Sequence, residues 1–197
     1  MNKIELNIPW KRYALITKLA SSLQSTPNPQ FGKTALQKMV YLFQAIYKVN
    51  CGYNFELYTY GPFTSQLLHD LDVTEHMGGV EVCRVDASNG GYKIVPGKKA
   101  DVIIKKGENF LNDPEIKTKF SQLIANFGKY GAAGLELRST IVYVMHDFQG
   151  RGFQPDTEEI VQMVEEIKPK FSSDEIRYAA AELIDIITGP INLKFPH

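Results

Sequence analysis

Hydrophobic residues near the start of the chain repeat at helical spacing. In residues 10–23 and again in residues 33–48 they recur every three or four positions, as on one face of a helix. Pro9 suits the first turn of the first helix, because that turn does not use its backbone N–H. Thr34 and Gln37 have the spacing of a capping box at the start of the second. The pattern predicts two amphipathic helices.

A short alternating segment comes next. Residues 55–60 alternate and are rich in aromatic side chains, which favours a single strand. Gly61-Pro62 ends this strand and places Pro62 at the first position of a third helix. We expect that helix over residues 63–77, because Gly78-Gly79 follows and terminates it.

A β-hairpin is predicted directly after the third helix. Residues 80–85 and 92–95 alternate on either side of Asn89-Gly90-Gly91. Asn-Gly supplies the positive φ angles that a tight hairpin turn requires. Residues 101–105 fit either a further strand or a short helix.

The second half of the chain consists of helical segments. Asp113-Pro114 begins one that ends at about residue 127, and residues 135–148 are apolar on most sides, as in a buried central helix. Two more helices begin at pairs with capping-box spacing: Asp156 with Glu159, and Ser172 with Glu175.

These elements predict a mainly helical α+β protein. Helices followed by a hairpin favour a winged-helix-like half with a small antiparallel hairpin, over residues 1–106. We expect it to pack on a C-terminal helical bundle, residues 107–197, in one compact unit.

Composition and the lack of targeting segments indicate the cellular compartment. Apolar residues make up 44% of the 197 residues and charged residues 22%, as in ordinary globular proteins. Residues 1–6 lack the start of a signal peptide, and no segment approaches the ~18 apolar residues of a membrane helix. We expect a cytoplasmic protein without a membrane partner, in which Cys51 and Cys83 are reduced, buried thiols.

The net charge of zero conceals an asymmetry between the halves. Residues 1–106 carry 13 Lys and Arg against 8 Asp and Glu, and the remaining residues carry 9 against 14. Such a division is typical of a nucleic-acid-binding face or of a self-complementary interface, so a homodimer is one expectation.

No residue set forms a catalytic signature. Gly32-Lys33-Thr34 lacks the earlier glycine and the preceding strand of a phosphate-binding loop. His69, Asp72 and His76 roughly share one helix face, but that face is expected to be solvated, so we predict no metal or cofactor. His146-Asp147, at a helix end, is expected to cap carbonyls. A scattered enzymatic site stays open as an alternative.

Two binding surfaces are candidates. Most of the aromatic residues around residue 58 should be core, and the rest could form a partner-binding surface. Its residues are Tyr58, Tyr60, Gly61, Pro62, Phe63 and Thr64. The hairpin offers a basic, nucleic-acid-binding wing of Arg84, Lys93, Lys98 and Lys99. Against DNA, the third helix is expected to expose Asp70, Asp72 and Glu75, and acidic side chains repel phosphate.

Four segments carry a family resemblance. They are residues 36–42 (LQKMVYL), 58–64 (YTYGPFT), 67–72 and 167–172 (IKPKFS). They resemble the YwgA-like prokaryotic winged-helix proteins and, more distantly, the Panacea (SocA-like) domains of antitoxins and protease adaptors.

The resemblance implies a regulatory or antitoxin-like protein that acts by binding another protein. It carries no catalytic residues, and the helical C-terminal half is larger than in the compact antitoxin domain. A sequence-specific DNA-binding transcriptional regulator of winged-helix type is the alternative.

Overall fold

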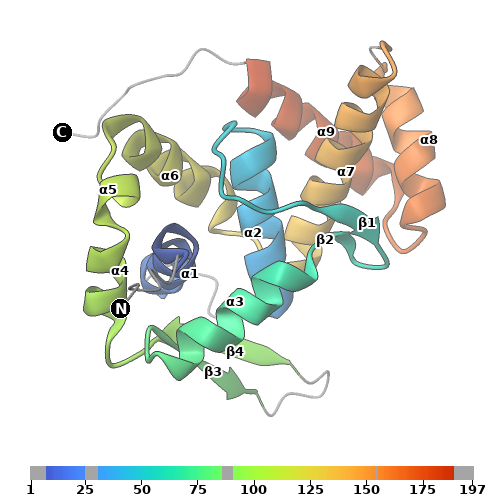
Figure 1. Cartoon of the computed structure of the whole chain (residues 1–197). Helices are drawn as coiled ribbons and strands as arrows, with labels where there is room; N and C mark the ends of the chain where they lie inside the picture. Colours follow the sequence, from blue (N-terminus) through green and yellow to red (C-terminus); the bar gives the residue numbers. More distant parts are fainter. Residues whose placement is uncertain (1–7, 25–30, 86–90, 154, 189–197) are drawn as a thin grey trace, which may run out of the picture.

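The protein is mainly helical, with two small antiparallel hairpins (Figure 1). A computed structural model describes residues 8–24, 31–85, 91–153 and 155–188. The helices are α1 (Trp10–Leu23), α2 (Lys33–Ala45), α3 (Ser65–His76), α4 (Ala100–Lys106), α5 (Glu108–Leu111), α6 (Pro114–Phe127), α7 (Ala132–Gly150), α8 (Thr157–Ile167) and α9 (Ser173–Thr188). The strands are β1 (Glu56–Tyr58), β2 (Gly61–Phe63), β3 (Val80–Arg84) and β4 (Tyr92–Pro96).

The α2 helix lies at the centre of the fold. Figure 1 shows it between α1, α4 and α5 on one side and α7, α8 and α9 on the other. Leu36, Met39 and Phe43 are fully buried, and α2 packs against both α6 and α7. One apolar core cluster therefore contains residues from both halves of the chain.

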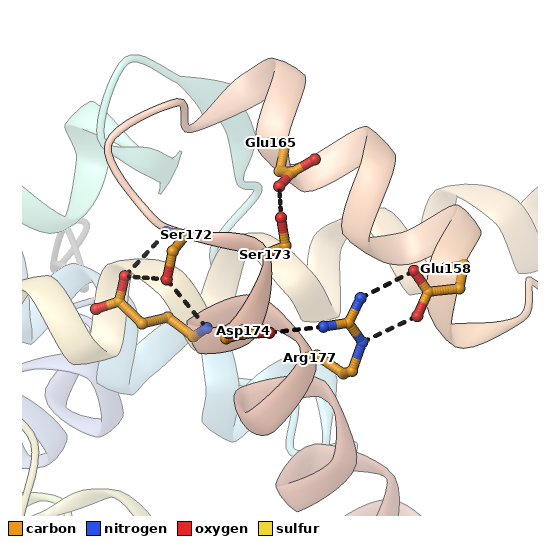
Figure 2. Close-up of polar contacts among 7 residues, drawn as sticks. Glu158, Glu165, Ser172, Ser173, Asp174 and Arg177 are labelled. Atoms are coloured by element: carbon orange, nitrogen blue, oxygen red, sulfur yellow. Dashed lines mark hydrogen bonds and ion pairs between the residues drawn. The ribbon is translucent and has the colours of Figure 1, made fainter.

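Several helix starts are as predicted. Asp113 accepts hydrogen bonds from the first backbone N–H groups of α6, and Asp156 forms a capping box with Glu159 on α8. Ser172 and Glu175 bond reciprocally at the start of α9, beside which Arg177 forms an ion pair with Glu158 of α8 (Figure 2).

The capping box predicted at the start of α2 is wrong. Gly32 occupies the cap position without a side-chain bond, and Gln37 turns away to bond Thr64. The backbone N–H and carbonyl of Thr64 offer this buried amide both a donor and an acceptor, which the start of the helix does not.

The segment predicted as one strand is a hairpin. β1 turns at Thr59-Tyr60 and returns as β2, with Leu57 opposite Pro62. Gly61, at φ 82°, adopts a backbone conformation that side chains disfavour. Pro62 is consequently a strand residue and not the first residue of a helix, so α3 begins later, at Ser65.

The second hairpin confirms the predicted pair of strands. β3 pairs antiparallel with β4, from Val80 opposite Pro96 to Arg84 opposite Tyr92. Of its predicted turn, Asn89 and Gly90 lie outside the described residues. Residues 101–105 belong to α4, which settles the choice between strand and helix.

Two expectations drawn from composition can be compared with the structure. No helix in the described parts of the chain combines the length and the apolar character needed to cross a bilayer. Cys51 is buried, as expected, but Cys83 is exposed, because it lies on an outward-facing position of β3. Both thiols are free.

Candidate partner-binding site

The β1–β2 hairpin divides the predicted partner-binding residues into two groups. Tyr58 and Tyr60 are 66% and 62% exposed. Gly61, Pro62 and Thr64 are buried, and Phe63 is half-buried with its ring 5.8 Å from that of Tyr58. Only the two tyrosines therefore present a surface of any size, and the others support them.

Two neighbouring side chains of α2 hydrogen-bond to β2 and to Thr64, the residue after it. Lys38 is 1% exposed, and its ammonium donates a hydrogen bond of 2.7 Å to the carbonyl of Pro62. The Gln37 amide donates to the carbonyl of Thr64 at 2.7 Å and accepts from its N–H at 3.0 Å. These bonds satisfy backbone groups that would otherwise be buried without partners.

A buried carboxylate, Glu136 of α7, lies beside the hairpin and binds two lysines. Its two oxygens are 2.8 Å from the ammonium groups of Lys168 and Lys170. Lys168 is 3% exposed and also donates to the carbonyl of Thr59, in the hairpin turn. The segment between α8 and α9 is thus attached to the hairpin by a charged, buried contact.

Burial and pairing set the charges of this cluster. Burial lowers the pKa of Lys38 to about 8, partly opposed by Glu136 and reinforced by Lys168. Burial by itself would raise the pKa of Glu136, but the hydrogen bonds from Lys168 and Lys170 outweigh it, so that pKa is lowered. Glu136 is therefore ionised at neutral pH.

The pattern of hydrophobic and polar residues did not single out Lys38, Glu136 or Lys168. A signal was present for two of them, since Lys38 lies inside the apolar stripe of α2 and Glu136 inside the most apolar helix. A charged residue at a core position is rare unless it is paired. The sequence could not indicate which group it pairs with.

The predicted wing residues lie around the β3–β4 hairpin. Arg84, Lys98 and Lys99 are exposed, and Lys93 is half-buried. The carbon stem of Lys99 lies against Gly78, where an added Cβ would be 3.5 Å from it.

The predicted acidic face of α3 needs a correction. Asp70 is 1% exposed, lies 3.0 Å from Arg12 of α1 and accepts a hydrogen bond of 2.8 Å from the Tyr53 hydroxyl. It points inward because it shares the helix face of Leu67 and Leu71, which pack in the core. Asp72 and Glu75 are exposed, as predicted.

The histidine-containing pairs can now be placed. His69 and His76 are exposed on α3, and the described residues contain no group of three side chains able to hold a metal ion. His146 does not cap a helix end, because its ring faces Lys48, while Asp147 forms an ion pair with Arg151.

Comparisons of the chain with family models, with curated proteins and with solved structures found no match. The residues and their geometry are therefore the basis for a functional assignment.

Proposed function

We propose that this chain is a regulatory or antitoxin-like protein that acts by binding another protein through the β1–β2 hairpin. The observation that carries the proposal is the exposure of Tyr58 and Tyr60 on a hairpin whose backbone is bonded to buried side chains. Tyrosine contributes a large contact area at low cost in side-chain entropy, and it is enriched in binding surfaces.

The hairpin suits recognition because it is preorganised. Lys38, Gln37 and Lys168 bond the carbonyls of Pro62, Thr64 and Thr59, so β2 and the turn are held. β1 is attached through its pairing with β2. A surface that is already ordered loses less conformational entropy when a partner binds. The YwgA-like resemblance of residues 36–42 and 58–64 supports the same surface, since these segments contain the turn, β2 and the donors Gln37 and Lys38.

Affinity capture with a double variant tests the proposal. The bait is the full chain, with Tyr58→Ala and Tyr60→Ala, returned to its native host at near-native levels. Both side chains are exposed, so we expect the variant to fold and to lose most of its partner, as when interface hot-spot tyrosines are truncated. Mass spectrometry of the captured proteins measures the stoichiometry.

Tyr178 provides the matched control, because it is 73% exposed on α9. Tyr178→Ala should retain the partner at the wild-type level. The proposal is wrong if wild-type bait recovers no stoichiometric protein, or if the double variant recovers the same protein as well as Tyr178→Ala does.

A winged-helix arrangement that binds DNA is the second candidate. It is supported by the order of elements, since α1, α2 and α3 precede the β3–β4 hairpin, and by contacts of α1 with α3 and β4. Arg84, Lys98 and Lys99 are exposed around that hairpin, and burial of Asp70 removes one negative charge from the exposed face of α3.

Fluorescence anisotropy with duplex DNA at several salt concentrations tests this candidate. If the wing contacts phosphates, Arg84→Gln and Lys98→Gln should each weaken binding and reduce the salt slope by about 1. Lys117→Gln, at an exposed position of α6, is the control and should leave binding unchanged. Absence of binding at low salt would exclude DNA binding as the function.

A further inference from the structure

A shallow, open cleft of about 380 Å³ lies between the end of α2, the segment before β1 and α7. None of the residues of the proposed partner-binding or wing surfaces lines it. Its volume is within the range of sites that hold small molecules. The cleft is therefore worth considering as a separate site.

One wall of the cleft is aromatic. The ring of Phe55 lies 5.4 Å from that of Tyr41 and 6.3 Å from that of Tyr53, both near edge-to-face. Gln44 fixes this wall, because its side chain donates to the Tyr53 carbonyl at 2.9 Å and accepts from the Tyr53 N–H at 3.2 Å. Tyr41 and Tyr53 are buried, so the half-buried ring of Phe55 is the surface that this wall offers to a flat group.

The lining of the cleft also includes a cation without a counterion, Lys48. The Lys48 ammonium lies 3.5 Å from the imidazole Nε2 of His146. Among the described residues no carboxylate forms an ion pair with Lys48, and Asp147, next to His146, is paired with Arg151. An ammonium group without a carboxylate partner is a binding group for an anion.

His146 lies beside that ammonium. Burial, and then the charge of Lys48, lowers the pKa of His146 below its usual 6.5, so the ring is neutral at physiological pH. A neutral ring leaves Lys48 as the charged group of this pair. Lys48 also has a φ of 56°, the one positive φ outside glycine among the described residues, a conformation that often accompanies functional positions.

We propose that this cleft binds a small anion that carries a flat ring, of the aromatic carboxylate class, with its charged group on Lys48 and its ring against Phe55. The two features that select this class are the unpaired ammonium and the aromatic wall, which line one cleft. The inference goes beyond the proposed function and does not depend on it.

Titration of the ¹⁵N-labelled chain with benzoate tests the proposal by NMR. We expect saturable shifts confined to amides around Lys48, Phe55 and His146. Acetate supplies the charge without the ring, and benzamide supplies the ring without the charge. Both should bind more weakly than benzoate.

Lys48→Asn removes the charge with little backbone strain, because asparagine tolerates positive φ better than most residues. We expect it to weaken benzoate binding roughly two- to fivefold, as for loss of a partly exposed ion pair. His146→Gln should weaken binding less, and it provides a second variant should Lys48→Asn fail to fold. Lys117→Asn, the same substitution at an exposed position of α6, should match wild type.

Three outcomes would overturn the site: no saturable shifts up to the solubility limit of benzoate, acetate binding as tightly as benzoate, or unchanged affinity in folded variants at Lys48 and His146. None of these outcomes alters the partner capture by Tyr58 and Tyr60, so the two proposals fail separately.

Discussion

Glu136 is the residue that balances the buried charge behind the β1–β2 hairpin. Its carboxylate is paired with Lys168 and Lys170, and Lys168 in turn bonds the hairpin turn. A buried ion pair contributes little net stability, but removing one partner leaves an uncompensated charge. Substitution of Glu136 should therefore cost more stability than the ion pairs themselves contribute.

We expect Glu136→Gln to lower the free energy of unfolding by about 3 kcal/mol, because the buried Lys168 loses its anion. Urea denaturation followed by circular dichroism measures the change. Lys170→Ala is the control, since Lys170 is 51% exposed and its loss should cost less than about 1 kcal/mol. Equal losses in the two variants would contradict this account.

The acid side of the stability profile depends on the same residue. The pKa of Glu136 is lower in the folded chain than its ordinary 4.5. The ionised carboxylate therefore contributes fully to the free energy of unfolding above pH 4.5. The contribution is lost as pH falls through the folded pKa. Stability of Glu136→Gln should accordingly fall less steeply in acid than that of wild type.

Titration of Lys38 should change the stability of the fold at alkaline pH. Its pKa is about 8 in the folded chain and 10.5 ordinarily, so between these values the unfolded chain binds more protons and stability rises with pH. From about pH 7 to about pH 9.5, wild type should gain about 1–2 kcal/mol relative to Lys38→Met. Urea midpoints at several pH values measure this difference. Parallel profiles of the two proteins would show that Lys38 does not titrate in this range.

At the scale of elements, local interactions explain which helix starts were predictable. Ser172 and Glu175 are three residues apart, so their reciprocal bonds form within one helical turn whatever the rest of the chain does (Figure 2). The β1–β2 hairpin was missed because its turn, Thr59-Tyr60, has none of the usual turn residues. Alternation continues through that turn and resembles one strand.

We expect Ser172→Ala to lower the free energy of unfolding by about 1 kcal/mol, because α9 loses its cap. Ser121→Ala is the matched control, since Ser121 is exposed within α6 and bonds only a carbonyl of its own helix. Its effect should be near zero, because alanine favours a helix more than serine does. Thermal unfolding followed by circular dichroism distinguishes the two, and an equal effect of both substitutions would exclude a capping role.

At the scale of the whole molecule, the two halves of the chain share one core. The central α2 helix packs on α6 and α7, which follow residue 106, while α1 packs on α3, α4 and α5. Without α6 and α7, the face of α2 that packs on them would be exposed. The folded halves should therefore depend on each other.

Trp10, the single tryptophan, makes this dependence measurable. It lies at the start of α1, and Lys106 lies over its ring at 5.6 Å. We expect its fluorescence and the far-ultraviolet circular dichroism of all helices to change in one coincident urea transition, as for a cooperative unit. Two separated transitions would show that the halves unfold independently.

The sequence by itself determined the features that depend on residues close together in the chain. The periods of α1 and α2, the Asp113-Pro114 start of α6, the β3 and β4 strands and the capping box of Asp156 with Glu159 each arise within a few residues, and each was predicted. The sequence pattern did not determine whether Tyr58 and Tyr60 are exposed, because their alternation suits a core strand as well as a surface one.

Only the tertiary structure decided which polar residues lie inside. Asp70 is buried because Arg12 and Tyr53 from other elements meet it, and Lys38 because its ammonium reaches a carbonyl 24 residues away. Glu136 joins a lysine 32 residues further along the chain. A charge is tolerated in a core only where a partner offsets its desolvation, and such partners are set by packing between distant segments.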